Sequence, residues 1–415
     1  MDVIVDRCAG LDVHKKTVMA TVRVPDGRGG RSQVTREFAT FAGRLVELRE
    51  WLVAEGVTQV AMEATGVYWR PVWHVLEEAP GLELLLVNPA HFKNLPGRKT
   101  DVKDSEWLAQ LLECGLLRGS FVPPADIVKL RDLTRYRSKL IGERVRETQR
   151  VQKLLEDAGI KLDSVVTDVL GVSGRQMLEA LIAGERDPEV LAEMARARMR
   201  SKIGVLREAL VGRFNDHHAL LLRVHLDHID ELTAMEAHLD GEVDRLMAPF
   251  AEAATRLLSI PGVGKRVAEV VVAEAGIDMS RFPTDKQLAS WAGLCPGHHE
   301  SAGKRRSGKA RKGNPALRTA LCEAAWAASH GKDGYLPAQF RRFKRRFGTR
   351  GETKAIFALA HTMIVIVWHV LADNVGYDDL GADFFDRRAD SQARQRQLVR
   401  QLEALGHKVT LEPAA

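Results

Sequence analysis

The order of the β-type and helical patterns in the first 113 residues constrains the fold more than any other feature. Three β-type runs come first, and helical and β-type runs then alternate. The expected strands are 8–14, 17–24, 34–39, 57–63 and 82–87, and the expected helices are 41–54, 68–79 and one that starts near residue 101. Three antiparallel strands followed by β-α-β crossovers predict a mixed five-stranded sheet with helices on both faces. The first and fourth strands can then be parallel neighbours.

Four acidic residues fall at related places in this pattern. Asp12 and Glu63 lie at or near the carboxyl ends of the first and fourth expected strands, where ligands of open α/β sheets collect. Asp101 and Asp104 stand three residues apart at the start of the third helix, so their side chains share one face. Clustered carboxylates need a cation, protons or a basic partner, and if the partner is a metal, hard oxygen ligands favour Mg²⁺ or Mn²⁺.

Each acid also has an ordinary explanation. Asp101 suits an N-cap, Asp104 suits the first turn of a helix, and an aspartate at a strand end is often a turn residue. The joint pattern is more specific than any one acid, and it resembles the RNase H-like nuclease fold. A pair of divalent ions in such a site can activate a nucleophile and stabilise a leaving oxygen in phosphodiester chemistry.

The composition indicates a reduced setting and a polyanionic partner. The chain has 415 residues and a net charge of +6, and its Lys and Arg residues are dense after Cys295. Its four cysteines form no CxxC pair, and no signal peptide is apparent, so we expect a cytoplasmic protein. The apolar run Ala355–Leu371 is short for a membrane span and contains two histidines, so we expect a buried helix and no membrane.

Residues 125–250 are predicted to form a helical spacer. A long polar helix over 128–157 and another over 215–247 carry apolar residues at three-and-four spacing, which indicates a coiled coil or an ordinary helical bundle. Shorter helices are expected over 174–183, 188–197 and 202–211. We expect this spacer to link domains or to dimerise, and it contains no catalytic grouping.

Residues 254–275 resemble a helix-hairpin-helix around Ile260-Pro-Gly-Val-Gly264. Gly262 and Gly264 would free backbone N–H groups for phosphate, and Lys265 and Arg266 would add charge. A glycine-rich turn between packed helices is the alternative.

Ser290–Pro315 is small, polar and cationic, and we expect it to form a loop without a core. Its cations suit a phosphate backbone, and the candidate contacts are Lys304, Arg305, Arg306, Lys309, Arg311 and Lys312. Ser301 precedes this run and could attack a phosphodiester if activated, although a plain loop serine is the simpler interpretation and Ser307 is a rival. Apolar helices over 317–328 and 354–371 would build the core, and Arg341–Phe347 interleaves aromatic and basic residues as nucleic-acid surfaces do.

Six segments recur in order in one known family. They are Gly10-Leu-Asp-Val-His-Lys15, Met62-Glu-Ala-Thr-Gly-Val-Tyr-Trp69, Asn88-Pro89, Lys99-Thr-Asp-Val-Lys-Asp104, Ile260-Pro-Gly-Val-Gly264 and Trp291-Ala-Gly-Leu-Cys-Pro296 with the basic serine loop. Over about residues 4–370 the chain resembles the DEDD transposases of bridge-RNA-guided insertion sequences, relatives of the pilin-gene invertase.

The resemblance implies a RuvC-like domain over residues 1–122 in which Asp12, Glu63, Asp101 and Asp104 bind metal. A C-terminal transposase domain over 251–375, mainly α-helical, would supply Ser301 as a nucleophile that forms a 5′-phosphoserine link to DNA. Beyond the resemblance, the charged residues from Asp386 to about Leu402 predict a helical tail over 376–415. The implied partners are DNA at the element ends and target, a structured non-coding RNA that selects the sequence, and further copies of the chain in a dimer or tetramer formed through the spacer.

Two other functions remain open on the sequence. In a RuvC-like, metal-dependent junction nuclease, water would attack and Ser301 would only position phosphate. A non-catalytic nucleic-acid scaffold would bind without chemistry, but clustered acids disfavour a pure binder of phosphate backbones.

Overall fold

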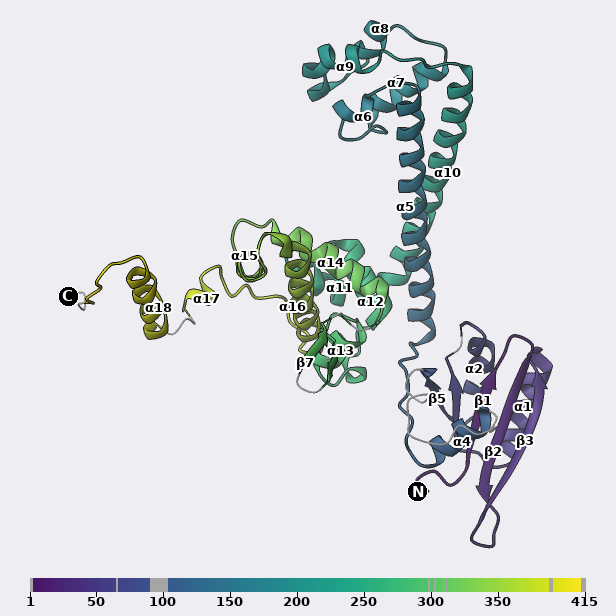
Figure 1. Cartoon of the computed structure of the whole chain (residues 1–415). Helices are drawn as coiled ribbons and strands as arrows, with labels where there is room; N and C mark the ends of the chain where they lie inside the picture. Colours follow the sequence, from purple (N-terminus) through teal and green to yellow (C-terminus); the bar gives the residue numbers. More distant parts are fainter. Residues whose placement is uncertain are drawn as a thin grey trace. The chain divides into compact units, whose positions relative to one another are not determined.

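The computed structural model divides into two compact units, Met1–Pro123 and Pro124–Ala415. It describes residues 3–64, 66–89, 104–297, 299–301, 304–308, 310, 312–387 and 391–411, with the backbone alone for 299–301, 304–307, 386, 391–394 and 397. Figure 1 shows the whole chain, and each unit is described below by itself.

A mixed five-stranded sheet forms the first unit, as predicted. Its strands are β1 (Cys8–Val13), β2 (Thr17–Pro25), β3 (Arg31–Ala39), β4 (Gln59–Glu63) and β5 (Glu83–Val87). They lie in the order β3-β2-β1-β4-β5, in which β1 is antiparallel to β2 and parallel to β4. The predicted adjacency of the first and fourth strands is therefore confirmed.

The third strand begins three residues earlier than expected because the turn before it is tight. Asp26 Oδ1 accepts hydrogen bonds of 2.8 Å from the backbone N–H groups of both Arg28 and Gly30. This closed turn lets pairing start directly at Pro25 and Arg31.

Helices cover both faces of the sheet. They are α1 (Ala42–Ala54), α2 (Trp69–Glu77) and α4 (Asp104–Glu113). The larger core lies on the face of α1 and α2 and includes Ala9, Leu11, Val13, Leu48, Leu52, Val60, Met62, Val72 and Leu76. The smaller core lies on the α4 face and consists of Cys8, Ala61, Val87, Leu108, Leu111 and Leu112. Side chains alternate between faces along a strand, so β1 and β4 each contribute to both cores.

The backbones of α4 and β1 meet at Gly10. A Cβ atom at this position would lie 2.3 Å from the carbonyl oxygen of Ser105 and 2.4 Å from the backbone nitrogen of Ala109. The Ser105 hydroxyl also forms a 2.9 Å hydrogen bond with the Thr21 hydroxyl of β2. Only glycine permits this approach, which seats the first turn of α4 on the sheet.

We predict that Gly10→Ala displaces α4, with a cost of about 1–3 kcal/mol for overpacking. Hydrogen exchange of the backbone amides of α4 should become faster, because the helix no longer packs closely against β1. Gly43→Ala is the matched control: a Cβ there meets nothing within 4 Å. Unchanged α4 exchange in Gly10→Ala would contradict the packing argument.

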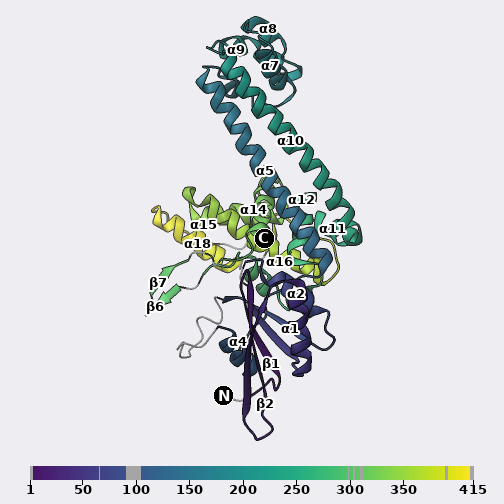
Figure 2. The same cartoon turned by 90° about the vertical axis from the view of Figure 1, so that its right-hand side faces the viewer.

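The second unit contains a long helical arm. The arm pairs α5 (Ala125–Asp157) with α10 (Asp216–Met247), which run side by side (Figures 1 and 2). Its tip consists of α6 (Leu162–Val165), α7 (Val172–Ile182), α8 (Pro188–Glu193), the 3-10 helix η1 (Ala197–Lys202) and α9 (Ile203–Ala209). Asn215 caps α10 and forms a reciprocal capping box with His218.

A helical body follows the arm. Its elements are η2 (Ala248–Phe250), α11 (Ala251–Leu258), α12 (Lys265–Ala275), η3 (Met279–Arg281), α13 (Asp285–Trp291), α14 (Pro315–Ser329), α15 (Tyr335–Phe347), η4 (Thr349–Gly351) and α16 (Glu352–Ala372). Among the residues described, the stretch Thr349–Ala372 alone is long and apolar enough to span a membrane. Half of its most apolar window is buried, and α16 packs against α11, α13, α14 and α15, as a core helix does.

The expectation that Ser290–Pro315 contributes nothing to the core is wrong for the first residues of this stretch. Ala292 and Leu294 are buried, because the turn after α13 folds back onto the body. The hairpin of β6 (His299–Ser301) and β7 (Lys304–Ser307) was also not predicted, since its strands are polar and short. The chain ends with α17 (Phe384–Arg387) and α18 (Ser391–Ala404).

Buried ion pairs fasten the base of the arm to the body. Arg137 of α5, with a side chain only 3% exposed, donates to Glu269 of α12 and to Asp240 of α10. Arg135 makes two hydrogen bonds, of 2.7 and 2.8 Å, to the buried carboxylate of Glu274 on α12. The periodicity of α5 did not reveal this network, because it registers apolar positions and not which arginines are paired.

Candidate functional site

Asp12 and Glu63 lie on the same face of the sheet, at the ends of neighbouring parallel strands. The β1–β4 register runs to Leu11 opposite Met62, and each acid is the next residue of its strand. Leu11 and Met62 point into the α1–α2 core, so the residues that follow point to the α4 face. Glu63 is buried and Asp12 is partly buried, with a side chain 18% exposed.

Asp104 comes to the same face because it is the first residue of α4. Burial raises the pKa of the Asp12 carboxyl above its usual value; the nearby His14 lowers this pKa, whereas the charges of Asp104 and Glu63 raise it further. The His14 Nε2 atom lies 3.1 Å from Asp12 Oδ2. The Asp12 carboxylate therefore lies within electrostatic range of both Asp104 and Glu63.

Asp101 lies outside the described residues. Within the part of the chain that is described, no group of three or more His, Cys, Asp and Glu side chains is arranged to hold a metal ion. The chemistry of the donors nevertheless fits a hard divalent cation, because carboxylate oxygens that repel one another are stabilised by a positive charge.

The predicted phosphate-binding turn joins α11 to α12. Gly262 has a left-handed φ of 88°, and a Cβ there would lie 2.3 Å from the carbonyl oxygen of Ala324 in α14. This glycine thus serves packing between helices, whereas Gly264, at the N-cap of α12, has open space around it.

The two cations beside this turn are held by acids of α10. The Lys265 ammonium lies 2.6 Å from Asp244, and the Arg266 guanidinium lies 2.5 Å from Glu236. Both side chains remain more than half exposed, so a phosphate would have to compete with these carboxylates.

Ser301 ends β6, where its backbone pairs with that of Lys304, the first residue of β7. Ser307, the rival serine, ends β7 opposite His299. Arg305 and Arg306 lie on β7 as well, Lys312 is exposed, and Lys309 and Arg311 fall outside the described residues. The hairpin thus brings the backbone of Ser301 beside the start of the basic run.

The chain after this hairpin is anchored by Asn314. Its side-chain oxygen accepts a 3.1 Å hydrogen bond from Leu317 N–H and caps α14, while its amide nitrogen donates a 2.6 Å hydrogen bond to Glu274. Glu274 also binds Arg135 of the arm. The sequence signal was weak: Asn314-Pro315 marks a helix start, but nothing in it points to Glu274.

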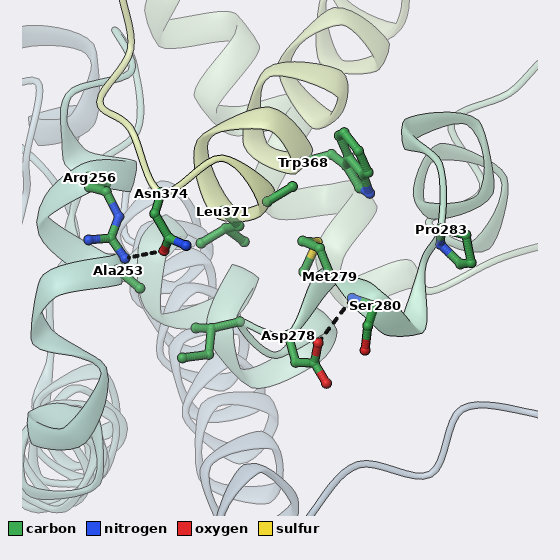
Figure 3. A pocket seen from close by; sticks show the side chains of 11 residues that line it. Ala253, Arg256, Asp278, Met279, Ser280, Pro283, Trp368, Leu371 and Asn374 are labelled. Carbon is green, nitrogen blue, oxygen red and sulfur yellow. Dashed lines mark hydrogen bonds between the residues drawn. The ribbon is translucent and has the colours of Figure 1, made fainter.

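A separate pocket of about 530 Å³ lies in the body between α11, η3 and the end of α16. Figure 3 shows Arg256 donating to Asn374 at one side of the pocket, with the apolar side chains of Leu371 and Met279 beside them. None of the predicted site residues lines this pocket.

Two family models match the chain. One, for DEDD transposases of the IS110 type and described as a transposase, matches residues 9–160. The other, described as the IS116/IS110/IS902 transposase family, matches residues 254–341. A putative transposase of Sinorhizobium fredii, y4rJ, is 30% identical over 318 residues, which cover 71% of this chain and 72% of the relative.

The chain belongs to the IS110 family of transposases. A probable family 20 transposase of Pseudomonas aeruginosa is 26% identical over 77% of this chain and 85% of its own length. A pilin gene-inverting protein of Moraxella bovis is 35% identical over 30% of this chain and 38% of its own length. The protein is thus a DNA transposase/recombinase, and membership in a DEDD family indicates the use of a divalent metal.

We predict that Asp12→Asn raises the unfolding temperature of this transposase in EDTA. The raised pKa of Asp12 means that the fold favours the neutral carboxyl, so a permanently neutral side chain removes repulsion. The gain should shrink as the pH falls and the wild-type carboxyl takes up its proton. Calorimetry at several pH values measures this difference.

Asp26→Asn is the control with the opposite sign. Hydrogen bonds from the backbone N–H groups of Arg28 and Gly30 lower the pKa of Asp26, so loss of its charge should not stabilise the fold. An unfolding temperature of Asp12→Asn below that of the wild type at neutral pH would contradict the repulsion argument.

Proposed function

We propose that this transposase cuts and rejoins DNA strands with a metal site made of Asp12, Glu63, Asp101 and Asp104. The observation that carries the proposal is the electrostatic coupling of Asp12 to Asp104 and Glu63 on one face of the sheet. Carboxylates in such proximity disfavour a polyanionic substrate unless a cation lies between them.

The residues of the RNase H-like domain have distinct roles in this proposal. When Mg²⁺ or Mn²⁺ is bound, it supplies charge stabilisation at the attacked phosphate and lowers the pKa of a bound hydroxyl. Asp12 and Glu63 provide fixed oxygen ligands on rigid strands, and Asp104 provides one from α4. His14 holds the Asp12 carboxylate by its hydrogen bond.

Ser301 is the proposed nucleophile. Its hydroxyl oxygen would attack the phosphorus, the bond to the 3′ oxygen would break, and the released 3′ oxygen would take up the proton. The product is a 5′-phosphoserine bond, which keeps the energy of the phosphodiester for rejoining. Support comes from the family membership and from the position of Ser301 beside Lys304 at the start of the basic run.

We also propose how the rest of the chain serves this reaction. Residues 125–250 would form the spacer, 251–375 the transposase domain and 376–415 the tail. Gly262, Gly264, Lys265 and Arg266 would bind backbone phosphates, as would the cations of 304–312. A structured RNA would choose the DNA sequence, and the protein would bind mostly backbone and shape.

A covalent trap tests the serine step. The protein is incubated with Mg²⁺, the RNA transcribed beside its gene and DNA from the flanks of that gene, and is then denatured. We expect a DNA-linked protein band with the wild type and with the Ser307→Ala control. Asp104→Asn should give a weaker band. Ser301→Ala should remove the band.

Other outcomes of the trap decide between the alternatives. Cut DNA without a protein–DNA bond would support a junction nuclease in which water attacks. Binding without any cutting in wild type would support a non-catalytic scaffold. An undiminished band in Ser301→Ala would exclude Ser301 as the nucleophile.

We further propose that the arm joins copies of the chain. Leu220 and Val224 stand one turn apart on α10, and the two residues are 63% and 55% exposed. We expect Leu220→Asp/Val224→Asp to lower the oligomer mass measured by light scattering. Val172→Asp on the tip, at a side chain 72% exposed, is the control. An unchanged mass in the double variant would contradict dimerisation through this face.

A further inference from the structure

Helix α15 carries the basic stretch whose composition is typical of nucleic-acid surfaces, and its arginines have no part in the site described above. Arg341, Arg342, Arg345 and Arg346 are all exposed. Successive residues of an α-helix are about 100° apart, which places these four within an arc of about 140°. Phe340, Phe343 and Phe347 start from the opposite side of the helix, although the Phe347 ring reaches to within 6.0 Å of the Arg346 guanidinium.

These arginines differ from those of the arm in their partners. Over the described residues, none of the four lies within ion-pair distance of a carboxylate, whereas Lys344 beside them pairs with Glu352. Arg341 donates to a backbone carbonyl at 3.5 Å, and the Arg342 guanidinium lies over the ring of Phe385. The arginines of α5 at 135 and 137 instead meet buried acids.

Helix stability alone does not explain this arrangement. Cations in the last turn of a helix suit its dipole, which accounts for residues 344–346. Arg341 and Arg342 lie a turn earlier, where the dipole effect has faded. Four mutually repelling cations without acidic partners point to a polyanion that arrives from outside the chain.

We infer that the arc of Arg341, Arg342, Arg345 and Arg346 binds the phosphate backbone of duplex DNA. Arginine presents a planar fork that suits phosphate oxygens, and contacts to phosphate give affinity without sequence preference. The inference rests on DNA being the substrate, as the family membership establishes, and not on the metal or serine chemistry. The second family match ends at residue 341, so the surface lies almost wholly beyond it.

Two features of the fold support this surface. Leu336, Pro337 and Phe340 in the N-terminal half of α15 are buried. They therefore hold the C-terminal half, which carries the arginines, in a fixed position. Asp379 accepts a 2.9 Å hydrogen bond from Tyr335 N–H and fixes the start of the helix. The arginines are thus presented by a well-packed helix, which limits the entropy lost when DNA binds.

The salt dependence of DNA binding tests the inference. Fluorescence anisotropy with a labelled 30-base-pair duplex in EDTA measures binding while excluding metal-dependent cleavage. We expect Arg345→Gln/Arg346→Gln to reduce the slope of log K against log salt by about 2, and affinity in 0.1 M salt by roughly tenfold or more. Arg345→Lys/Arg346→Lys should restore the slope, because it restores the charges.

Arg198→Gln/Arg213→Gln is the matched control. Both residues are exposed. Arg198 lies in η1 and Arg213 lies between α9 and α10, and within the described chain neither forms an ion pair. This control should leave the slope unchanged, and circular dichroism confirms that each variant is folded. An unchanged slope in the α15 variant, or an equal drop in the control, would overturn the inference.

The same measurement with RNA distinguishes binding of DNA from binding of RNA. A slope that falls for a folded RNA of equal length but not for the duplex would also overturn the assignment to DNA. Because binding is measured without divalent metal, failure of the serine or metal proposals leaves this test unaffected.

Discussion

The close approach of α4 to β1 is the contact on which the proposed acidic site depends. Asp104 begins α4, whereas Asp12 and Glu63 belong to the sheet, so the three meet only if the helix lies directly on the strand. Gly10 makes this possible because it has no side chain between the two backbones. The hydrogen bond between Thr21 and Ser105 then fixes the helix along its axis. The proposed site thus depends on backbone packing, and the charges of Asp104 and Glu63 add repulsion at Asp12 that the packing must overcome.

The first unit was largely predictable because its signals are local. Strand alternation and the order of strands and helices indicated the mixed sheet, and the parallel pairing of β1 with β4 followed from connection rules. This pairing places Asp12 and Glu63 together without any knowledge of side-chain contacts. The tight approach at Gly10 was not foreseen, since a glycine in a strand also fits a bulge or a turn.

The second unit was harder to predict, because its decisive contacts join residues far apart in sequence. Arg135 and Glu274 are 139 positions apart, and a helical pattern records only that each lies on a helix. The basic run after Ser301 looked like an unstructured loop because its strands lack apolar alternation. Likewise, the expected phosphate-binding role of Gly262 came from a motif, whereas the helix that packs against it lies more than sixty residues away.

The carboxylate of Glu274 links two parts of the second unit. It accepts a hydrogen bond from Arg135 at the base of the arm. It also accepts one from the side-chain amide of Asn314, which follows the hairpin of β6 and β7. The carboxylate itself is buried, so leaving it without these partners would be costly. A displacement of α5 at Arg135 would therefore strain the same carboxylate that holds Asn314, the residue that caps α14 after the hairpin.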